Sequence, residues 1–204
     1  MNQLNIEFLL ELLKTPSPSS QEMMIQKKWM NYVKNDVDEI RTDNAGHVDE
    51  VAFIIKRIDE NGYAYVETIG RINPKSAIGM KVEIIGDEKS IPGVFGVNAQ
   101  HHGGIKGDFD EQDLFIDCGF QSKQQAEQHI VIGDLVVYRR DPDILMDQYI
   151  TGRGLDNRTG AFIVAEVMKR LAKKDLKVGV YGVSTVNEET NMGGAYFAAA
   201  GLQP

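Results

Sequence analysis

The sequence predicts an α/β protein in which a mixed-sheet α/β domain is interrupted by an inserted small antiparallel β-barrel domain. Three observations predict this fold class. Apolar residues recur at helical spacing before residue 51, short strands separated by glycine and proline fill 51–144, and helix again alternates with strand in 145–204. We therefore expect two domains, one formed by 1–50 with 145–204 and the other by 51–144.

Two helices are expected in the first part of the chain. The apolar face of the first is formed by Ile6, Leu9, Leu10 and Leu13. Pro16 and Pro18 end that helix. Ser19 and Glu22 have the spacing of a capping box, which predicts that a second helix starts there. Its inner face is formed by Ile25, Trp29, Tyr32 and Val33.

The middle of the chain has the pattern of a β domain. Six short strands are predicted, at 51–58, 63–68, 81–85, 94–97, 114–118 and 135–138. Asn61-Gly62 between the first two predicts a tight hairpin. Ser122 is placed to cap a short helix at 123–129, with Gln125 closing a capping box. Strands of this length and spacing are typical of a small antiparallel barrel or sandwich.

The last part of the chain returns to alternating helix and strand. One helix has an apolar face formed by Ala161, Val164, Val167, Met168 and Leu171. Its opposite face carries Glu166, Lys169, Arg170 and Lys173. The apolar run at 178–186 predicts a buried strand, and a further helix is expected to begin at Gly193. This alternation favours a mixed or parallel sheet.

Composition limits the partners and the compartment. The formal net charge is -8 with no basic block, so neither nucleic acid nor an anionic membrane is expected as a partner. No apolar run approaches the ~20 residues of a membrane span. The single cysteine, Cys118, excludes an intrachain disulfide and favours a reducing, cytoplasmic compartment. The first residues show no signal-peptide pattern.

Glu188 and Glu189 follow the predicted strand at 178–186 after one residue, Asn187. Two carboxylates at the mouth of a buried strand are costly to desolvate unless the protein uses them. Adjacent side chains of an extended segment point to opposite sides, so one carboxylate could bind a metal while the other moves a proton. The alternative is a pair of solvated glutamates in a loop.

Two further segments carry candidate ligands. His47 with Asp49 can be a metal ligand with the carboxylate that orients its ring, or an ordinary exposed histidine. Asp156 can bridge two metal ions through its two oxygens, or cap the following helix. These residues all lie at ends or junctions of the α/β part, where ligands of such sheets gather. Histidine with aspartate and glutamate suits Zn²⁺ or Co²⁺.

In this order, the three segments resemble the M42 metallo-aminopeptidases, a group that includes glutamyl aminopeptidases and some proteins labelled endoglucanases. The resemblance spans nearly the whole chain. It covers the His-x-Asp-Glu block at 47–50, the Leu-Asp-Asn-Arg block within 154–158 and the Glu-Glu block at 188–189. In the β domain it also covers 113–119, 122–123 and 133–134.

The resemblance implies a metallopeptidase, an enzyme that hydrolyses the first peptide bond of short peptides with two divalent metal ions, zinc or cobalt. His47 would ligate one ion, with Asp49 holding its ring. Asp156 would bridge both ions, and Glu189 would ligate the second. Glu188 would be the general base.

The sequence departs from the family pattern in two places. The resemblance places two more ligands, an acidic residue and a histidine, further along, and they have no counterpart here. His47 also follows Gly46 at once, where the family has a hairpin and another buried strand. Each ion would have two protein ligands, whereas a catalytic zinc normally has three. We therefore expect weak or partial metal binding and impaired activity. His101, His102 and His129 are interpreted as surface or core residues of the β domain.

The resemblance also implies a homo-oligomer built of dimers, often a dodecamer, in which the β domain makes the dimer contact. One alternative is a non-catalytic remnant of the family that self-associates through the β domain. Another is a glycosidase with Glu188 and Glu189 as acid and base. Adjacent residues fit the glycosidase poorly, because paired glycosidase carboxyls flank the sugar from opposing faces.

Overall fold

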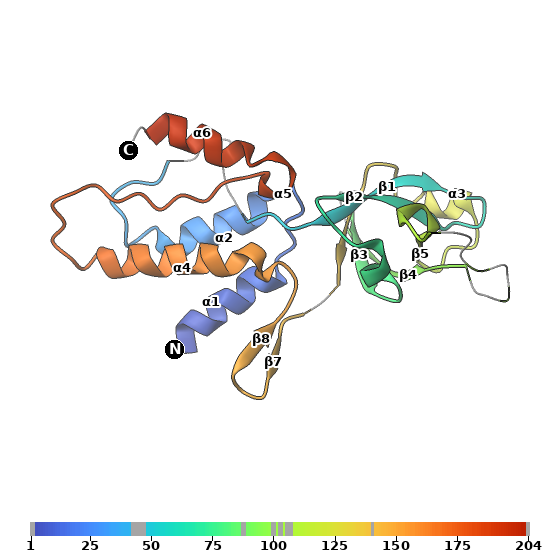
Figure 1. Ribbon diagram of the computed structural model, residues 1–204, viewed down its shortest axis with the longest axis horizontal. Coiled ribbons are helices and arrows are strands. Elements are labelled where there is room, and N and C mark those ends of the chain that lie inside the picture. The colour runs from blue at the N-terminus through green and yellow to red at the C-terminus, as the bar shows by residue number, and fades with distance from the viewer. Residues whose placement is uncertain are drawn as a thin grey trace. The chain divides into compact units, whose positions relative to one another are not determined.

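The computed structural model describes residues 3–41, 48–86, 89–98, 101, 104, 108–139 and 141–202. By its internal contacts the chain divides into two compact units, 1–50 with 141–204 and 51–140. Figure 1 labels most of the helices and strands of the two units. Within these ranges, every helix is too short or too polar to cross a bilayer.

The unit formed by 51–140 contains a closed antiparallel barrel, as the sequence predicts. Its strands are β1 (Ala52–Ile58), β2 (Ala64–Ile69), β3 (Lys81–Ile85), β4 (Ser90–Gly96), β5 (Phe115–Asp117) and β6 (Leu135–Tyr138). They close in the order β1-β2-β5-β4-β3-β6. Between them lie the short helices η1 (Pro74–Ala77), η3 (Glu111–Asp113) and α3 (Lys123–Ala126). All six predicted strands are present, with ends shifted by a few residues.

The barrel interior is filled by alternate side chains of the strands, as the pleat requires. Phe53 of β1 is fully buried, and its ring meets Phe95 and Tyr138 edge-on at centroid distances of 4.8 and 5.6 Å. The predicted hairpin turn after β1 needs glycine. Gly62 has a φ of 89°, and a Cβ there would lie 2.9 Å from the Cβ of Phe120.

The cap of α3 is confirmed in part. The hydroxyl oxygen of Ser122 accepts from the backbone N–H of Gln125 at 3.2 Å, as expected of a cap. The side chain of Gln125, however, accepts from the backbone N–H of Gln121. The capping box is therefore closed one residue earlier than predicted.

The other unit is built around three helices that pack together, α1 (Gln3–Lys14), α2 (Met23–Val33) and α4 (Leu155–Leu171). Their shared core includes Leu12, Leu13, Ile25 and Ala165, all fully buried. The remaining elements are the hairpin β7 (Asp143–Leu145) with β8 (Tyr149–Thr151), α5 (Glu188–Asn191) and α6 (Gly193–Leu202). Together with the barrel they confirm the predicted α/β class.

The buried face of α4 differs from the predicted one. Ala161, Phe162 and Ala165 are buried, whereas Val167 is 45% exposed. Two polar side chains expected on the outer face instead hold α2. The hydroxyl of Tyr32 donates to Glu166, and Nζ of Lys169 donates to the carbonyl of Tyr32 at 3.2 Å. Burial and the hydrogen bond to Glu166 raise the pKa of Tyr32.

The predicted capping box at the start of α2 is wrong. The carboxylate of Glu22 accepts from the backbone N–H of Ser20 at 2.8 Å, and the helix begins at Met23 without a side-chain cap. Ser19 is buried, and its hydroxyl donates to Asp49 at 2.7 Å. The Ser19 side chain therefore bonds to a residue distant in the sequence, which local spacing did not indicate.

The predicted buried strand at 178–186 is also wrong. The segment is irregular, with Val178 72% and Tyr181 64% exposed, and Figure 1 draws it as a coil leading to α5. It contacts α4 at Gly182, where a Cβ would lie 2.7 Å from Met168. Among the described residues no strand pairs with this segment, so its backbone groups form no inter-strand hydrogen bonds there.

Candidate metal and catalytic site

The site residues predicted from the sequence belong to the unit formed by 1–50 and 141–204. His47 lies outside the described residues. Asp49 is fully buried, and Glu50 is 3% exposed. Glu50 forms a parallel bridge with Pro18, and its backbone N–H donates to the carbonyl of Ser17 at 3.0 Å. The first predicted block is therefore anchored on the turn between α1 and α2.

Asp49 connects the first block to the third. Its carboxylate accepts from the hydroxyl of Ser19 at 2.7 Å. It also accepts long hydrogen bonds from the backbone N–H groups of Glu188 at 3.4 Å and Glu189 at 3.3 Å. Carboxylates commonly satisfy the free N–H groups that begin a helix. Its expected contact with the ring of His47 stays a prediction, because His47 is outside the described residues.

Glu188 and Glu189 do not extend a strand. They form the first turn of the short helix α5, which follows Asn187 at a φ of 56°. Both side chains are half-buried. Adjacent residues of a helix are only about 100° apart around its axis. The expectation that the two carboxylates point to opposite sides, which assumed an extended segment, is therefore wrong, although each side chain remains accessible.

Asp156 is exposed at the start of α4. The backbone departs from helical dihedral angles at Asp156 and Asn157. The side-chain oxygen of Asn157 accepts from the backbone N–H of Gly160 at 2.9 Å, which is the contact of a helix cap. Asn157, and not Asp156, therefore caps the regular part of α4. The Asp156 carboxylate forms no hydrogen bond or ion pair with another described residue.

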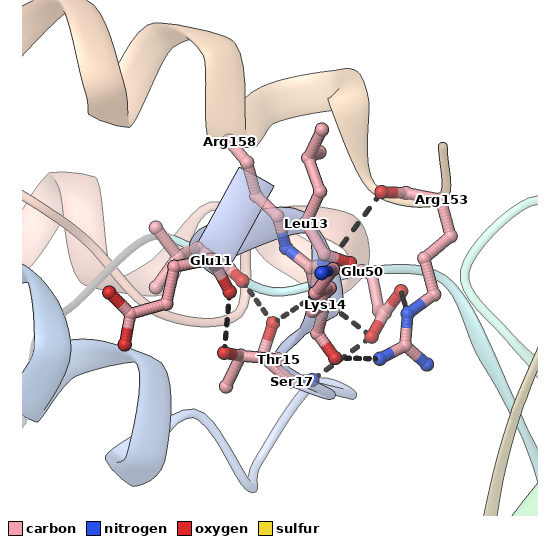
Figure 2. A network of polar contacts seen from close by, with 9 residues as sticks. Glu11, Leu13, Lys14, Thr15, Ser17, Glu50, Arg153 and Arg158 are labelled. Atoms are coloured by element: carbon pink, nitrogen blue, oxygen red, sulfur yellow. Dashed lines mark hydrogen bonds and ion pairs between the residues drawn. The ribbon is translucent and has the colours of Figure 1, made fainter. Parts of the chain in front are cut away.

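A buried polar network connects the first block to the second (Figure 2). Arg158 is fully buried, and its Nη2 donates to Glu50 at 2.9 Å and to the hydroxyl of Ser17 at 2.7 Å. Its Nη1 donates to the carbonyl of Leu13 at 3.1 Å. Glu50 also accepts from the backbone N–H of Ser17 at 2.9 Å, and Nε of Arg153 lies 3.8 Å from its carboxylate. Burial lowers the pKa of Arg158, and the Glu50 carboxylate opposes that shift.

Sequence reasoning did not assign a role to Glu50 or Arg158, although both lie inside the quoted blocks. One signal could have found Arg158. It precedes Ala161, Phe162 and Ala165 at helical spacing, which places it on the buried face of α4. An arginine on a buried face needs an acidic partner, because an unpaired buried charge is very costly.

The donor types fit a divalent metal, but the described residues do not complete a ligand set. Asp156 and the two glutamates offer carboxylate oxygens that suit such ions. In the part of the chain that the structure describes, no three His, Cys, Asp or Glu side chains are grouped to hold a metal. His47 is not among the described residues. His101 and His129 are both exposed in the barrel unit, which fits their interpretation as surface or core residues, and His102 lies outside the described residues.

Comparisons with known proteins place this geometry in a family. The Escherichia coli protein FrvX, named as an aminopeptidase, is 29% identical over 98% of this chain and 62% of its own length. An aminopeptidase from the archaeon Desulfurococcus kamchatkensis superposes with a TM-score of 0.89 at 25% identity, over 98% of this chain and 61% of its own. A TET1 peptidase of Pyrococcus horikoshii, described as assembling into a tetrahedron or a large octahedral shell, has a TM-score of 0.84 at 25% identity, over 96% and 64%.

The chain spans about three-fifths of the length of these relatives. The alignment with FrvX covers 225 positions, more than the 204 residues of the chain, so part of that relative has no counterpart within the matched span. A family model described as M42 glutamyl aminopeptidase matches residues 30–204. This chain therefore belongs to the M42 glutamyl aminopeptidase family.

Proposed function

We propose that the chain carries the catalytic base and part of the metal-ligand set of an aminopeptidase that removes N-terminal residues from short peptides. One observation supports this most directly. The buried Asp49 carboxylate accepts hydrogen bonds from the backbone of Glu188 and Glu189, which joins two of the three predicted blocks. By accepting these bonds, the Asp49 carboxylate fixes the backbone, and so the side-chain positions, of Glu188 and Glu189.

Two divalent ions, zinc or cobalt, are the cofactors we propose. His47 and Asp156 would hold one ion, and Asp156 and Glu189 the other. When bound, such a pair supplies a water of lowered pKa and polarises the scissile carbonyl. Glu188, half-buried in α5, takes the proton from the attacking water on its carboxylate and gives it to the departing amine. Asp49 holds the backbone of Glu188 in place for that transfer.

We propose that residues 1–204 bind these ions weakly or partially and have low activity. They supply two predicted protein ligands for each ion, whereas a catalytic zinc normally has three. The exposure of Asp156 supports weak binding, because an exposed carboxylate is well solvated before it meets a metal.

We also propose that the chain self-associates, with the barrel unit in the dimer contact and a dodecamer as the full assembly. The shell-forming TET1 peptidase supports self-association by similarity. A cytoplasmic location is proposed from the single cysteine, Cys118.

Hydrolysis of an aminoacyl-nitroanilide with added Zn²⁺ or Co²⁺ tests the proposed activity. Glu188→Gln is expected to lower the rate by about 10²–10⁴-fold, because it removes the general base without changing the size of the side chain. Glu127→Gln, an exposed glutamate of the barrel unit, is the matched control and should keep the wild-type rate.

This assay, a measurement of assembly and an assay on a β-glucan together separate the alternatives. Metal-dependent hydrolysis that Glu188→Gln leaves unchanged contradicts the base assignment. Assembly without any hydrolysis supports the non-catalytic remnant. Hydrolysis of a β-glucan in the presence of a chelator supports the glycosidase.

A further inference from the structure

Asp49 and Glu50 are neighbours that make contacts in two directions. Asp49 contacts Ser19 and the backbone of Glu188 and Glu189 in the third block. Glu50 contacts Arg158 in the second block. This is the arrangement expected where the backbone is extended, because successive side chains then point to opposite sides.

We propose that Glu50 and Arg158 are positioning residues that fix the segment carrying Asp49 against the segment carrying Asp156. The proposal rests on the proposed function, because it concerns the same site residues. Glu50 follows Asp49 directly, and Arg158 lies two residues after Asp156. An ion pair between Glu50 and Arg158 therefore sets the separation between Asp49, which binds the backbone of Glu188 and Glu189, and Asp156.

The geometry of the pair is suited to positioning. Arg158 donates from Nη1 to the carbonyls of Leu13 and Arg153, and from Nη2 to Glu50 and the Ser17 hydroxyl. Four acceptors on two nitrogens of a planar group fix its orientation as well as its place. A lysine ammonium at the same position carries the charge but lacks the planar, forked set of N–H donors that makes these bonds.

Stability alone does not explain the pair. Buried ion pairs are often no more stable than apolar residues of similar volume, because both charges must leave water. Both side chains here are almost completely buried, so that cost applies to each. The Glu50–Arg158 pair is costly to desolvate, and it lies between two segments that carry predicted site residues. Its role is therefore to fix the relative position of these segments.

Two variants separate positioning from folding. Arg158→Lys keeps the charge and loses the fork. Glu50→Leu with Arg158→Met removes both charges and restores apolar packing. Both are expected to fold but to bind Co²⁺ at least about 10-fold more weakly than wild type, as is typical when a group that orients a metal ligand is changed. Lys28→Met, which breaks the more exposed pair with Glu11, is the control and should leave Co²⁺ affinity unchanged.

Amide hydrogen exchange of the metal-free protein gives a readout that does not depend on metal. The N–H groups of Glu50 and Arg158 donate to Ser17 and Gly154. In Arg158→Lys they should exchange about 10-fold faster, while the N–H of Lys34 at the end of α2 keeps its wild-type rate.

The outcomes are distinguishable. Unchanged exchange at Glu50 and Arg158 overturns the positioning role, and so does wild-type Co²⁺ affinity in both variants. Faster exchange at these two amides in a chain whose wild type binds no divalent ion supports the fixed geometry and overturns the proposed function instead.

Discussion

Arg158→Met is expected to lower the free energy of unfolding by about 3–5 kcal/mol, because it leaves the Glu50 carboxylate buried without its main ionic partner. Glu50 is 3% exposed, and Arg153 Nε, at 3.8 Å, is too far away to replace the 2.9 Å contact of Arg158. The loss should appear as a lower midpoint in urea denaturation, followed by the fluorescence of Trp29. This is the only tryptophan of the chain, and it packs on α4 through a hydrogen bond to Ala161.

The double variant Glu50→Leu/Arg158→Met is the matched control for that result. Removing both charges leaves no unpaired group, so most of the lost stability should return. A single variant that stays within about 0.5 kcal/mol of wild type, the usual range for a surface change, would contradict the buried ion pair.

Phe53→Ala is expected to destabilise the barrel by about 3–5 kcal/mol, because it opens a cavity in a closed interior that cannot easily collapse. Phe53 is fully buried and loses its ring contacts with Phe95 and Tyr138. Hydrogen exchange of the β1 and β6 amides under denaturant measures the change.

An exposed position of the same unit provides the comparison for Phe53. Gln124→Ala in α3 should change stability by less than about 0.5 kcal/mol. Equal protection of the barrel amides in Phe53→Ala and Gln124→Ala would show that Phe53 is not in the core.

Local patterns predicted the barrel well. The strands of a closed barrel alternate inward and outward, and turns such as the one at Gly62 need a residue with positive φ. Both signals are contained in a few neighbouring residues, so no distant contact is required to find them.

Features that depend on distant partners were predicted less well. Ser19 was expected to cap a helix, but its hydroxyl bonds to Asp49. The apolar run at 178–186 has the composition of a strand, yet a strand forms only where another strand supplies its hydrogen bonds. The buried face of α4 was misplaced because Glu166 and Lys169 pair with α2.

In the candidate site, too, local features were predicted and contacts between distant residues were not. The three blocks were identified from their residue types, and the structure joins the first to the other two through Asp49 and Glu50. The Glu50–Arg158 pair was missed because its members are 108 residues apart in the sequence. Spacing places Arg158 on a buried face, but neither composition nor spacing identifies its partner at that separation.

Calorimetric titration of residues 1–204 with Zn²⁺ tests the central claim, that His47, Asp156 and Glu189 converge on divalent ions. We predict weak binding of one ion or a fraction of one. Asp156→Ala should abolish it, and Asp175→Ala, an exposed acid of the same unit, should not. Zinc binding that Asp156→Ala leaves unchanged would contradict the ligand assignment, and two tight sites in the wild type would contradict the incomplete ligand set.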